Sequence, residues 1–407
     1  MAEDYLIVGA GEAGVAAAAA IRARAPASRI RLVSDEPGFP YERPPLSKNV
    51  LTGDPVPTLL RQPEWYAENR VELVEARATS IDAGNRRVAV TRAGAPDEAL
   101  TYDALLIATG AQARLLPFTD VLHLRRWDDA LKIRERLGGA RHIAVVGGGV
   151  IGLELASSAR ALGREVVVIE LADRLMARAL APDVGAWLLD IHRAAGVDVR
   201  LSAGVAGIES GAGGHEITLA DGSALSADLV LAGIGAAPDT RLAAEAGCAI
   251  DDGILVDARG RTSVEGIYAA GDGARFYHPD IDAHMRLEAW QHAGRHGAHV
   301  GNIMAGGDDD YRCTPWFWTD QHGINLQVAG LASEADHSVW RGDGPKRIAF
   351  HMRGDRLVAA STIDNGRDMR PAMQLIEAGW TGDAADLADE SVTLRALVQA
   401  TREPVTS

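Results

Sequence analysis

Residues 4–36 read DYLIVGAGEAGVAAAAAIRARAPASRIRLVSDE. An apolar strand is expected at 5–8, a helix at 15–24 and a second strand at 30–33, with the pattern G-x-G-x-x-G between the first strand and the helix. These glycines allow a tight turn, close approach of a pyrophosphate and close packing of helix on strand, while an acid after the second strand binds a ribose. The stretch therefore predicts a dinucleotide site that includes Gly9, Gly11, Gly14 and Asp35.

The pattern returns at residues 142–170, HIAVVGGGVIGLELASSARALGREVVVIE. Here a helix is expected at 153–162, capped by Gly163, between strands at 143–146 and 166–169. The glycine triplet consists of Gly147, Gly149 and Gly152. Two complete fingerprints in one chain predict two bound dinucleotides.

The second strand of this repeat ends at Glu170. A carboxylate at that position accepts hydrogen bonds from an adenosine 2′-hydroxyl and repels a 2′-phosphate. We therefore expect NADH in preference to NADPH. Arg174 and Arg178 follow closely and could weaken this preference.

Composition sets the broad class. The 407 residues suggest two or three domains, and the net charge of −15 argues against a nucleic-acid binder. No apolar run reaches the roughly 18 residues of a membrane span, so a cytoplasmic location is expected. The two cysteines, Cys248 and Cys313, form no C-x-x-C motif and are expected to be ordinary packed thiols.

Two further segments end in small residues. A strand is expected within LTYDALLIATGA, residues 100–111, and another within GIYAAGDGARF, residues 266–276, where Asp272 lies between glycines ahead of an expected helix. An aspartate at the carboxyl end of a strand suits the hydroxyls of a ribityl chain, although AAGD alone could be a plain turn. Because a hydride donor needs an acceptor, a flavin is the economical second cofactor.

The chain resembles the FAD-dependent ferredoxin reductases of bacterial oxygenase systems, the group of putidaredoxin reductase and biphenyl-dioxygenase ferredoxin reductase within the glutathione-reductase structural class. The resemblance lies in YERPPLSK, ATGA, GGGVIGLELA, VVVIE, AAGD, RLEAWQHA and WFWTDQHGINLQVAG. It implies an α/β fold with two Rossmann-like domains and a C-terminal α+β domain. The implied boundaries are 1–109 with 233–315 for the FAD domain, 110–232 for the NAD domain and 316–407 for the C-terminal domain.

The resemblance also implies roles for individual residues. Lys48 is expected beside the isoalloxazine ring, Glu154 near the nicotinamide and paired with Lys48, Asp272 on the ribityl chain, and Trp290 near the pyrimidine end of the ring. The remaining expected FAD contacts are Gly9, Gly11, Ala13, Gly14, Asp35, Arg43, Thr109, Gly110, Arg125 and Gly271. The remaining expected NAD contacts are Gly147, Gly149, Val150, Ile151, Gly152, Glu170 and Gly235.

The segment GFPYERPPLSK, residues 38–48, contains three prolines that restrict the backbone. A stiff loop that presents Lys48 to a flavin would raise the reduction potential, because a nearby cation favours the anionic reduced ring. The alternative is a solvated surface lysine. Related disulfide reductases carry a redox cysteine in this region, whereas the polar residues here are Ser47 and Asn49, so dithiol chemistry is not expected.

The expected reaction passes hydride from NADH to FAD and single electrons from FAD to a [2Fe-2S] ferredoxin of the Rieske or adrenodoxin-like type, in aromatic hydrocarbon catabolism. Trp316, Phe317 and Trp318 could line the electron exit, although core packing is the commoner role of such a trio. The rival functions are an NADH oxidase and an apoptosis-inducing-factor-like NADH-sensing binding protein. His292, His296 and His299 share a helical face, but no metal is expected because no fourth ligand is evident. The oligomeric state stays open.

Overall fold

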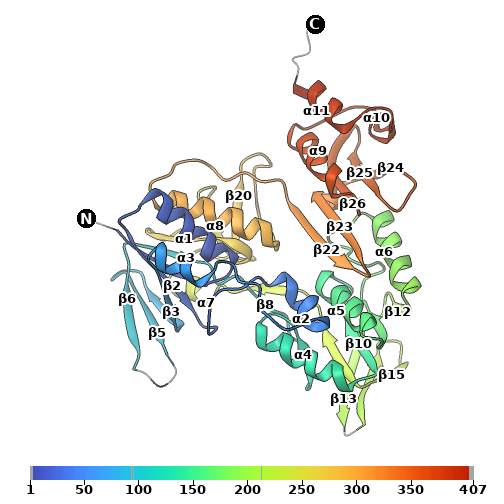
Figure 1. Ribbon diagram of the computed structural model, residues 1–407, viewed down its shortest axis with the longest axis horizontal. Coiled ribbons are helices and arrows are strands. Elements are labelled where there is room, and N and C mark those ends of the chain that lie inside the picture. The colour runs from blue at the N-terminus through green and yellow to red at the C-terminus, as the bar shows by residue number, and fades with distance from the viewer. Residues whose placement is uncertain (1–2, 93, 95, 212, 403–407) are drawn as a thin grey trace. The chain divides into compact units, whose positions relative to one another are not determined.

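The computed structural model describes residues 3–92, 94, 96–211 and 213–402. The chain divides into two compact units (Figure 1). Unit 1 comprises residues 1–42, 57–112 and 236–313, and unit 2 comprises residues 43–56, 113–235 and 314–407. The chain therefore passes between the units five times, and each unit is built from segments that are distant in sequence.

Unit 1 is centred on a parallel five-stranded sheet in the order β19-β7-β1-β2-β3. Its strands are β1 (Asp4–Val8), β2 (Arg29–Ser34), β3 (Val71–Glu75), β7 (Ala104–Ile107) and β19 (Ile267–Ala269). Leu6, Ile7 and Leu105 are fully buried, which is the pattern of a sheet that is covered on both faces. The position of β19 shows that the sheet needs a segment that is distant in sequence from its other four strands.

Two helices of unit 1, α1 (Glu12–Arg24) and α8 (Trp290–Met304), pack closely together. A Cβ atom on Gly297 would lie 2.1 Å from the carbonyl oxygen of Ala13, and one on Gly301 would lie 2.5 Å from that of Ala17. Only glycine on one helix and alanine on the other permit this approach. The contact fixes the N-terminus of α1 within the unit.

The other elements of unit 1 are short. Two antiparallel three-stranded sheets have the orders β4-β5-β6 and β18-β20-β21. Their strands are β4 (Arg77–Asp82), β5 (Arg87–Thr91), β6 (Glu98–Thr101), β18 (Ile254–Val256), β20 (Ala274–His278) and β21 (Ala283–Met285). The remaining elements are α3 (Pro63–Glu68), α7 (Arg241–Glu245), η2 (Gly271–Gly273) and the two-stranded sheet of β8 (Ala111–Ala113) and β17 (Ala236–Pro238).

Unit 2 contains a second parallel sheet, in the order β12-β11-β10-β16-β9. Its strands are β9 (Val121–His123), β10 (His142–Val146), β11 (Glu165–Ile169), β12 (Val197–Arg200) and β16 (Leu229–Ala232). An antiparallel sheet follows, made of β13 (Val205–Gly211), β14 (Gly214–Leu219) and β15 (Ala224–Ala227). The helices are α4 (Trp127–Gly139), α5 (Val150–Ala161) and α6 (Pro182–Ala194), and this arrangement repeats that of unit 1.

The end of unit 2 is an antiparallel sheet in the order β22-β23-β26-β25-β24 with three helices. The elements are β22 (Trp316–Gln321), β23 (Ile324–Gly330), η3 (Ala332–Glu334), β24 (His337–Arg341), β25 (Arg347–Arg353), β26 (Arg356–Ile363), α9 (Gly366–Glu377), α10 (Ala384–Ala388) and α11 (Leu394–Arg402). Phe350 and Leu375 are buried between the sheet and α9. The sheet also meets α6, because the indole of Trp340 donates to Asp183 at 2.8 Å.

Residues 43–56 belong to unit 2 although both of their flanks belong to unit 1. They form the short helices η1 (Pro44–Ser47) and α2 (Asn49–Thr52). The guanidinium of Arg134 on α4 donates to the carbonyl oxygens of Val50 and Leu51 at 3.0 and 3.1 Å. These bonds and the prolines hold the segment against α4.

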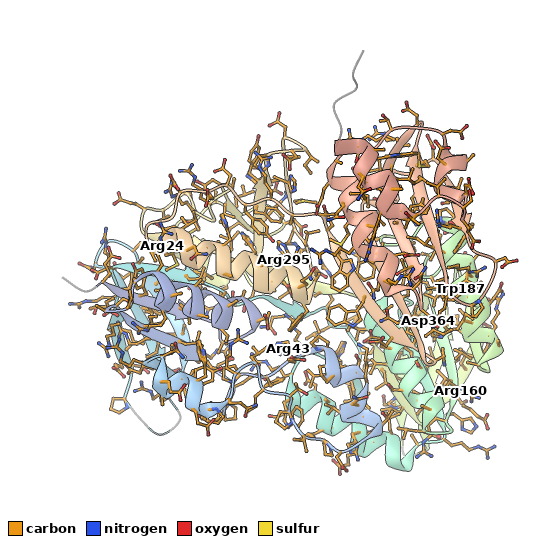
Figure 2. The ribbon with its side chains drawn as sticks, turned by 45° about the horizontal axis from the view of Figure 1, so that its top comes forward. Arg24, Arg43, Arg160, Trp187, Arg295 and Asp364 are labelled. Carbon is orange, nitrogen blue, oxygen red and sulfur yellow. The ribbon has the colours of Figure 1, made fainter. Side chains whose placement is uncertain are left out.

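Side chains throughout both units are shown in Figure 2, where Arg160 marks α5 and Trp187 marks α6. The α/β class with parallel sheets and an additional antiparallel C-terminal sheet agrees with the fold expected from the sequence. In the part of the chain that the structure describes, no helix is both long and apolar enough to cross a bilayer.

Two expected strands are shorter than the segments that predicted them, and two other expectations about elements are wrong. The strand expected in residues 100–111 is β7, which begins only at Ala104, because β6 ends at Thr101 and the intervening Asp103 carboxylate accepts the backbone N–H of Asp4 at 2.8 Å. The strand expected in residues 266–276 is β19, which ends at Ala269; Gly271 has φ +78°, and the chain turns through η2 before β20, which joins a different sheet. A strand, not a helix, therefore follows Asp272. Both glycine-loop helices begin earlier than expected, within the glycine pattern itself.

Candidate functional site: two glycine turns and a buried ion pair

The first glycine turn joins three segments of unit 1. Gly9 has φ +111°, and a Cβ there would lie 2.2 Å from the carbonyl oxygen of Ala108 at the end of β7. A Cβ on Gly14 would lie 2.0 Å from the carbonyl oxygen of Gly9. By contrast, a Cβ on Gly11, the N-cap of α1, would meet no atom within 4 Å. The turn is thus tightly packed at Gly9 and Gly14 and open at Gly11, in front of the N-terminus of α1. An anionic pyrophosphate fits in this open space.

The second turn has the same geometry in unit 2. Gly147 has φ +106°, and a Cβ there would lie 2.5 Å from the carbonyl oxygen of Gly233 beyond β16. A Cβ on Gly152 would lie 2.0 Å from the carbonyl oxygen of Gly147. Gly149 is the N-cap of α5, and its nearest neighbour would be 3.8 Å away. Each unit therefore has residues that fit a dinucleotide. Val150 and Ile151 form the first turn of α5, with Ile151 exposed.

The acids after the second strands differ in their surroundings. The carboxylate of Glu170 accepts the backbone N–H of Gly148, inside the glycine turn, and that of Ala172 at 2.7 Å. Asp35 is exposed at the end of β2. Glu170 is therefore fixed next to the site where an adenosine ribose is expected. Arg178 lies near Gly235, whose carbonyl oxygen accepts the N–H of Arg114 at 3.0 Å.

Two internal segments that are far apart in sequence meet beside the first turn. The hydroxyl of Thr109 donates to the carbonyl oxygen of Asp239 at 2.9 Å, and the carbonyl oxygen of Gly110 accepts the N–H of the same residue at 2.9 Å. A Cβ on Gly271 would lie 2.9 Å from that of Ala13 on α1. These expected FAD residues of unit 1 are thus brought together around the N-terminus of α1.

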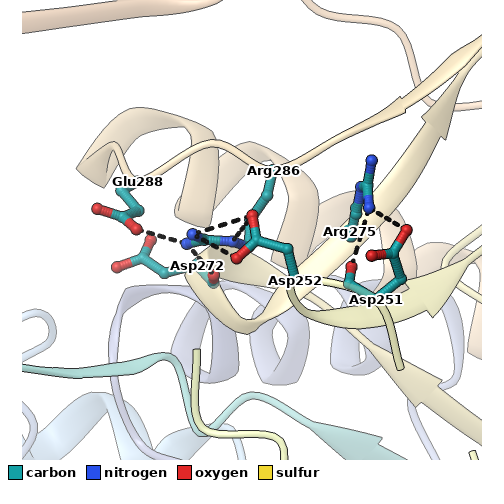
Figure 3. Close-up of polar contacts among 6 residues, drawn as sticks. All are labelled: Asp251, Asp252, Asp272, Arg275, Arg286 and Glu288. Carbon is teal, nitrogen blue, oxygen red and sulfur yellow. Dashed lines mark hydrogen bonds and ion pairs between the residues drawn. The ribbon is translucent and has the colours of Figure 1, made fainter. Parts of the chain in front are cut away.

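Asp272 follows Gly271 within η2. Its carbonyl oxygen accepts Nη1 of Arg286 at 3.5 Å, and Arg286 also pairs with Asp252 and Glu288 (Figure 3). Trp290 begins the nearby helix α8. The turn that carries Asp272 is therefore anchored by an arginine that sequence inspection did not single out.

Glu12, in the first turn of α1, is a second residue that sequence reasoning missed. Burial raises the pKa of its carboxyl to about 7, and the charge of Arg61 offsets only part of this effect. An acid in the first turn of a helix is common because of the helix dipole, so the sequence carries no signal that this one is buried against Gly294 of α8.

Lys48 and Glu154 form an ion pair within unit 2. The ammonium of Lys48 lies 2.9 Å from Oε1 of Glu154, and Glu154 is 2% exposed. The carboxylate also accepts the hydroxyl of Ser47 and that of Thr319, the latter at 2.6 Å. The structure therefore brings together two predicted residues and adds two that were not predicted as its partners. Three charge-assisted hydrogen bonds compensate for burial of the carboxylate.

Other predicted residues lie elsewhere in unit 2. Nη1 of Arg43 donates to the carbonyl oxygen of Arg125 at 2.6 Å, and the N–H groups of Arg125 and Arg126 donate to Asp129 at 3.0 and 2.8 Å. Trp316 and Trp318 stack with ring centroids 5.4 Å apart and are half-buried.

The cysteines lie in unit 1 and are not bonded to each other. Burial raises the pKa of the Cys248 thiol and that of Cys313, the latter to about 11. Neither thiol is therefore a ready nucleophile at neutral pH. His292, His296 and His299 surround Tyr311, and burial lowers the pKa of His292 to about 3. No group of potential metal ligands was found among the described residues.

The chain belongs to the pyridine nucleotide-disulphide oxidoreductase family. The model of that family matches residues 3–297, and a reductase C-terminal model matches residues 316–398. A relative in Burkholderia cepacia, the ferredoxin–NAD(+) reductase component of an anthranilate 1,2-dioxygenase system, is 38% identical over 97% of this chain and 99% of its own length.

Two solved structures are similar over nearly the whole chain. The ferredoxin reductase for the CYP199A2 system from Rhodopseudomonas palustris has a TM-score of 0.93 at 33% identity, covering 97% of this chain and 100% of that one. The reductase in the covalent putidaredoxin reductase–putidaredoxin complex has a TM-score of 0.92 at 34% identity, covering 99% of each chain.

Proposed function

We propose that this protein is an FAD-dependent NADH:ferredoxin reductase that supplies electrons to an oxygenase. The observation that carries the proposal is the presence of two complete glycine turns in a chain whose full-length relatives are ferredoxin–NAD(+) reductase components. One turn serves the hydride donor and the other the acceptor. The similar proteins include a component of a dioxygenase system and the ferredoxin reductase for the CYP199A2 system, so the type of oxygenase is left open.

FAD is assigned to unit 1 and NADH to unit 2. Gly9, Gly11 and Gly14 hold the FAD pyrophosphate at α1, and Asp35 takes the adenosine ribose. Asp272 is the ribityl contact, while Trp290, Thr109 and Gly110 complete the flavin site. In unit 2 the second turn and Glu170 hold the nicotinamide nucleotide. The proposed domain boundaries are those expected from the sequence, with 1–109 and 233–315 for FAD, 110–232 for NAD and 316–407 for the C-terminal domain.

Bound FAD would accept a hydride and release electrons one at a time. The protein's part is alignment and charge, because direct hydride transfer needs no general acid or base. Lys48 supplies a cation for the negative charge of the reduced ring, and Glu154 fixes the position of that cation. No cysteine occurs in residues 43–56, so electrons leave the flavin directly for the iron–sulfur partner.

The two alternative functions would differ from a ferredoxin reductase in their reaction with NADH. An NADH oxidase would turn over rapidly in air without a ferredoxin. An apoptosis-inducing-factor-like binding protein would form a stable charge-transfer complex with NADH and turn over slowly. Full-length similarity to ferredoxin reductases favours the reductase over both. A cytoplasmic location stays part of the proposal and is checked by cell fractionation.

The decisive experiment measures NADH-driven reduction of cytochrome c with and without [2Fe-2S] ferredoxins of the Rieske and adrenodoxin-like types. The reductase should be accelerated strongly by at least one ferredoxin. Rapid oxygen consumption that no ferredoxin alters would instead identify an oxidase. Stopped-flow mixing with NADH under anaerobic conditions separately tests whether the flavin is reduced.

A further inference from the structure

A continuous chain of hydrogen-bonded side chains leads from Glu154 through the C-terminal sheet to helix α6. Oγ1 of Thr319 lies 2.6 Å from Glu154 and 2.9 Å from Nε2 of Gln321. Oε1 of Gln321 lies 2.7 Å from Nε2 of His192, whose Nδ1 lies 3.1 Å from Nε2 of His322. All five residues belong to unit 2. The chain thus connects α5, β22 and α6 by side chains alone.

The carboxylate at one end determines the direction of every hydrogen bond. An ionised Glu154 only accepts, so the hydroxyl of Thr319 donates to it. The Thr319 oxygen must then accept from the amide NH₂ of Gln321, which leaves the Gln321 carbonyl oxygen to accept from Nε2–H of His192. The remaining lone pair, on Nδ1 of His192, accepts from Nε2–H of His322. Each donor therefore points toward Glu154.

Burial makes this order stable. Thr319, Gln321 and His192 are at most 3% exposed, so a reversed bond would leave two donors or two acceptors facing each other without water. Burial also lowers the pKa of His192 to about 4. A neutral ring with its proton on Nε2 is the form that the chain requires.

Two serines of α5 fix the backbone on either side of this series of hydrogen bonds. The hydroxyl oxygen of Ser157 accepts the backbone N–H of His322 at 2.8 Å. The hydroxyl of Ser158 donates to the backbone carbonyl of Ser47 at 2.6 Å, next to Lys48. The strand that carries Thr319 and the segment that carries Lys48 are therefore fixed to the same helix as Glu154.

We propose that Thr319, Gln321 and His192 are positioning residues that orient the Glu154 carboxylate, and through it the Lys48 ammonium, for hydride transfer. The inference rests on the proposed function insofar as Lys48 serves the flavin. It assigns to the C-terminal sheet a part in the NADH-dependent step, separate from any contact with a ferredoxin. Each residue acts through Glu154 and none needs to touch a cofactor.

The direction of the chain is tested first by nuclear magnetic resonance of the FAD-loaded protein labelled with ¹⁵N-histidine. His192, identified by the signals that H192N removes, should be neutral with its proton on Nε2 at pH 7. A proton on Nδ1 of His192, or a doubly protonated ring, would overturn the proposal. This measurement needs neither NADH nor a ferredoxin, and H192N serves only to assign the signals.

The effect on Lys48 is tested by anaerobic stopped-flow reduction of the flavin with NADH. T319V removes the hydroxyl at constant shape and should slow flavin reduction about tenfold, the range expected for one hydrogen bond to a charged group. T319S restores the hydroxyl and should recover most of the rate. The matched control is T362V, because Thr362 is a fully buried threonine of the same sheet whose hydroxyl has no partner in the described structure. T362V should leave the rate unchanged.

A double-mutant cycle distinguishes positioning from general loosening of the fold. If Thr319 acts through the ion pair, T319V should have little further effect in a K48M background. Additive effects, or equal losses in T319V and T362V, would contradict the proposal. Flavin reduction is measured without a ferredoxin, so failure of ferredoxin to accept electrons would refute the proposed function and leave this result intact.

Discussion

Helices α1 and α5 start from the same glycine turn but carry different side chains on one face. When Gly9 is aligned with Gly147, three alanines of α1, Ala16, Ala19 and Ala20, correspond to Glu154, Ser157 and Ser158 of α5. Helix α1 packs against the glycines of α8 through Ala13 and Ala17, which are not among these three alanines. The polar helix instead bonds to Lys48, Thr319, His322 and Ser47.

The comparison separates the glycine turn from the side chains of the helix that follows it. The turn itself is defined by backbone sterics and is the same in both units. The side chains of the following helix are free to vary, and in unit 2 Glu154, Ser157 and Ser158 bind charged and polar groups from two other parts of the chain. This polar network is therefore added to the repeat by three side chains and not by a change of fold.

The strongest way to break the equivalence of the two turns is to place a methyl group behind each of them. G9A forces a left-handed φ on alanine and sets its Cβ against the Ala108 carbonyl, so the first turn should collapse and the protein should purify without FAD. G147A should keep FAD but lose NADH-dependent flavin reduction. Flavin absorbance and stopped-flow reduction measure the two outcomes.

G11A provides the control, because its Cβ would enter open space. The variant should melt close to the wild type in the absence of FAD while binding FAD more weakly. An apo protein as unstable as G9A would show that the front of the turn is packed as well as the back.

A second experiment makes α5 resemble α1. E154A removes one partner of the buried ion pair and leaves Lys48, which is 19% exposed, without its carboxylate. The free energy of unfolding should fall by about 3 kcal/mol, as measured by urea denaturation. E165A is the matched control, because Glu165 forms an exposed pair with Arg141, and its free energy of unfolding should change far less than that of E154A. Equal losses would mean that burial adds nothing to the pair.

The acids at the ends of the second strands offer a third test. E170Q keeps one oxygen, which can still accept the N–H of Gly148, and removes the charge that repels a 2′-phosphate. The ratio of kcat/KM for NADH to that for NADPH should fall about tenfold, equivalent to about 1.4 kcal/mol. D35N, in unit 1, should leave that ratio unchanged. A ratio that stays constant in E170Q would show that the charge of Glu170 does not discriminate between the two nucleotides.

The smallest expected effect concerns the first turn of each helix, where Glu12 corresponds to Val150. Burial raises the pKa of Glu12 from 4.5 to about 7. The folded state therefore binds the proton more tightly than the unfolded state, and stability is lost as pH rises through this window. Relative to wild type, E12Q should be more stable at pH 8 by about 1 kcal/mol, after allowance for solvent screening of a half-buried group, and equal at pH 4.

The difference between the unfolding free energies of E12Q and wild type should thus grow from pH 4 to pH 8. A difference that is the same at both pH values would mean that Glu12 titrates normally in the folded protein.

Sequence patterns predicted the two turns because glycine at Gly9 and Gly147 is required by local sterics. They also predicted the α/β class and the family. They did not reveal the chain from Thr319 to His192, since its members are far apart in sequence and each is an ordinary polar residue. They predicted a helix after Asp272 where β20 follows, because the pattern of a strand that ends in glycines is common to both continuations. The roles of the cofactor residues stay predictions.

The five passages of the chain between its units affect how the protein is made on the ribosome. The strands of the unit 2 parallel sheet have all emerged once β16 is complete. The first glycine turn is synthesised almost at once, yet its sheet lacks an edge strand until β19 and its helix lacks a cover until α8. FAD capture should therefore be a late event in biogenesis, and nascent chains that end before Ala305 should bind no flavin.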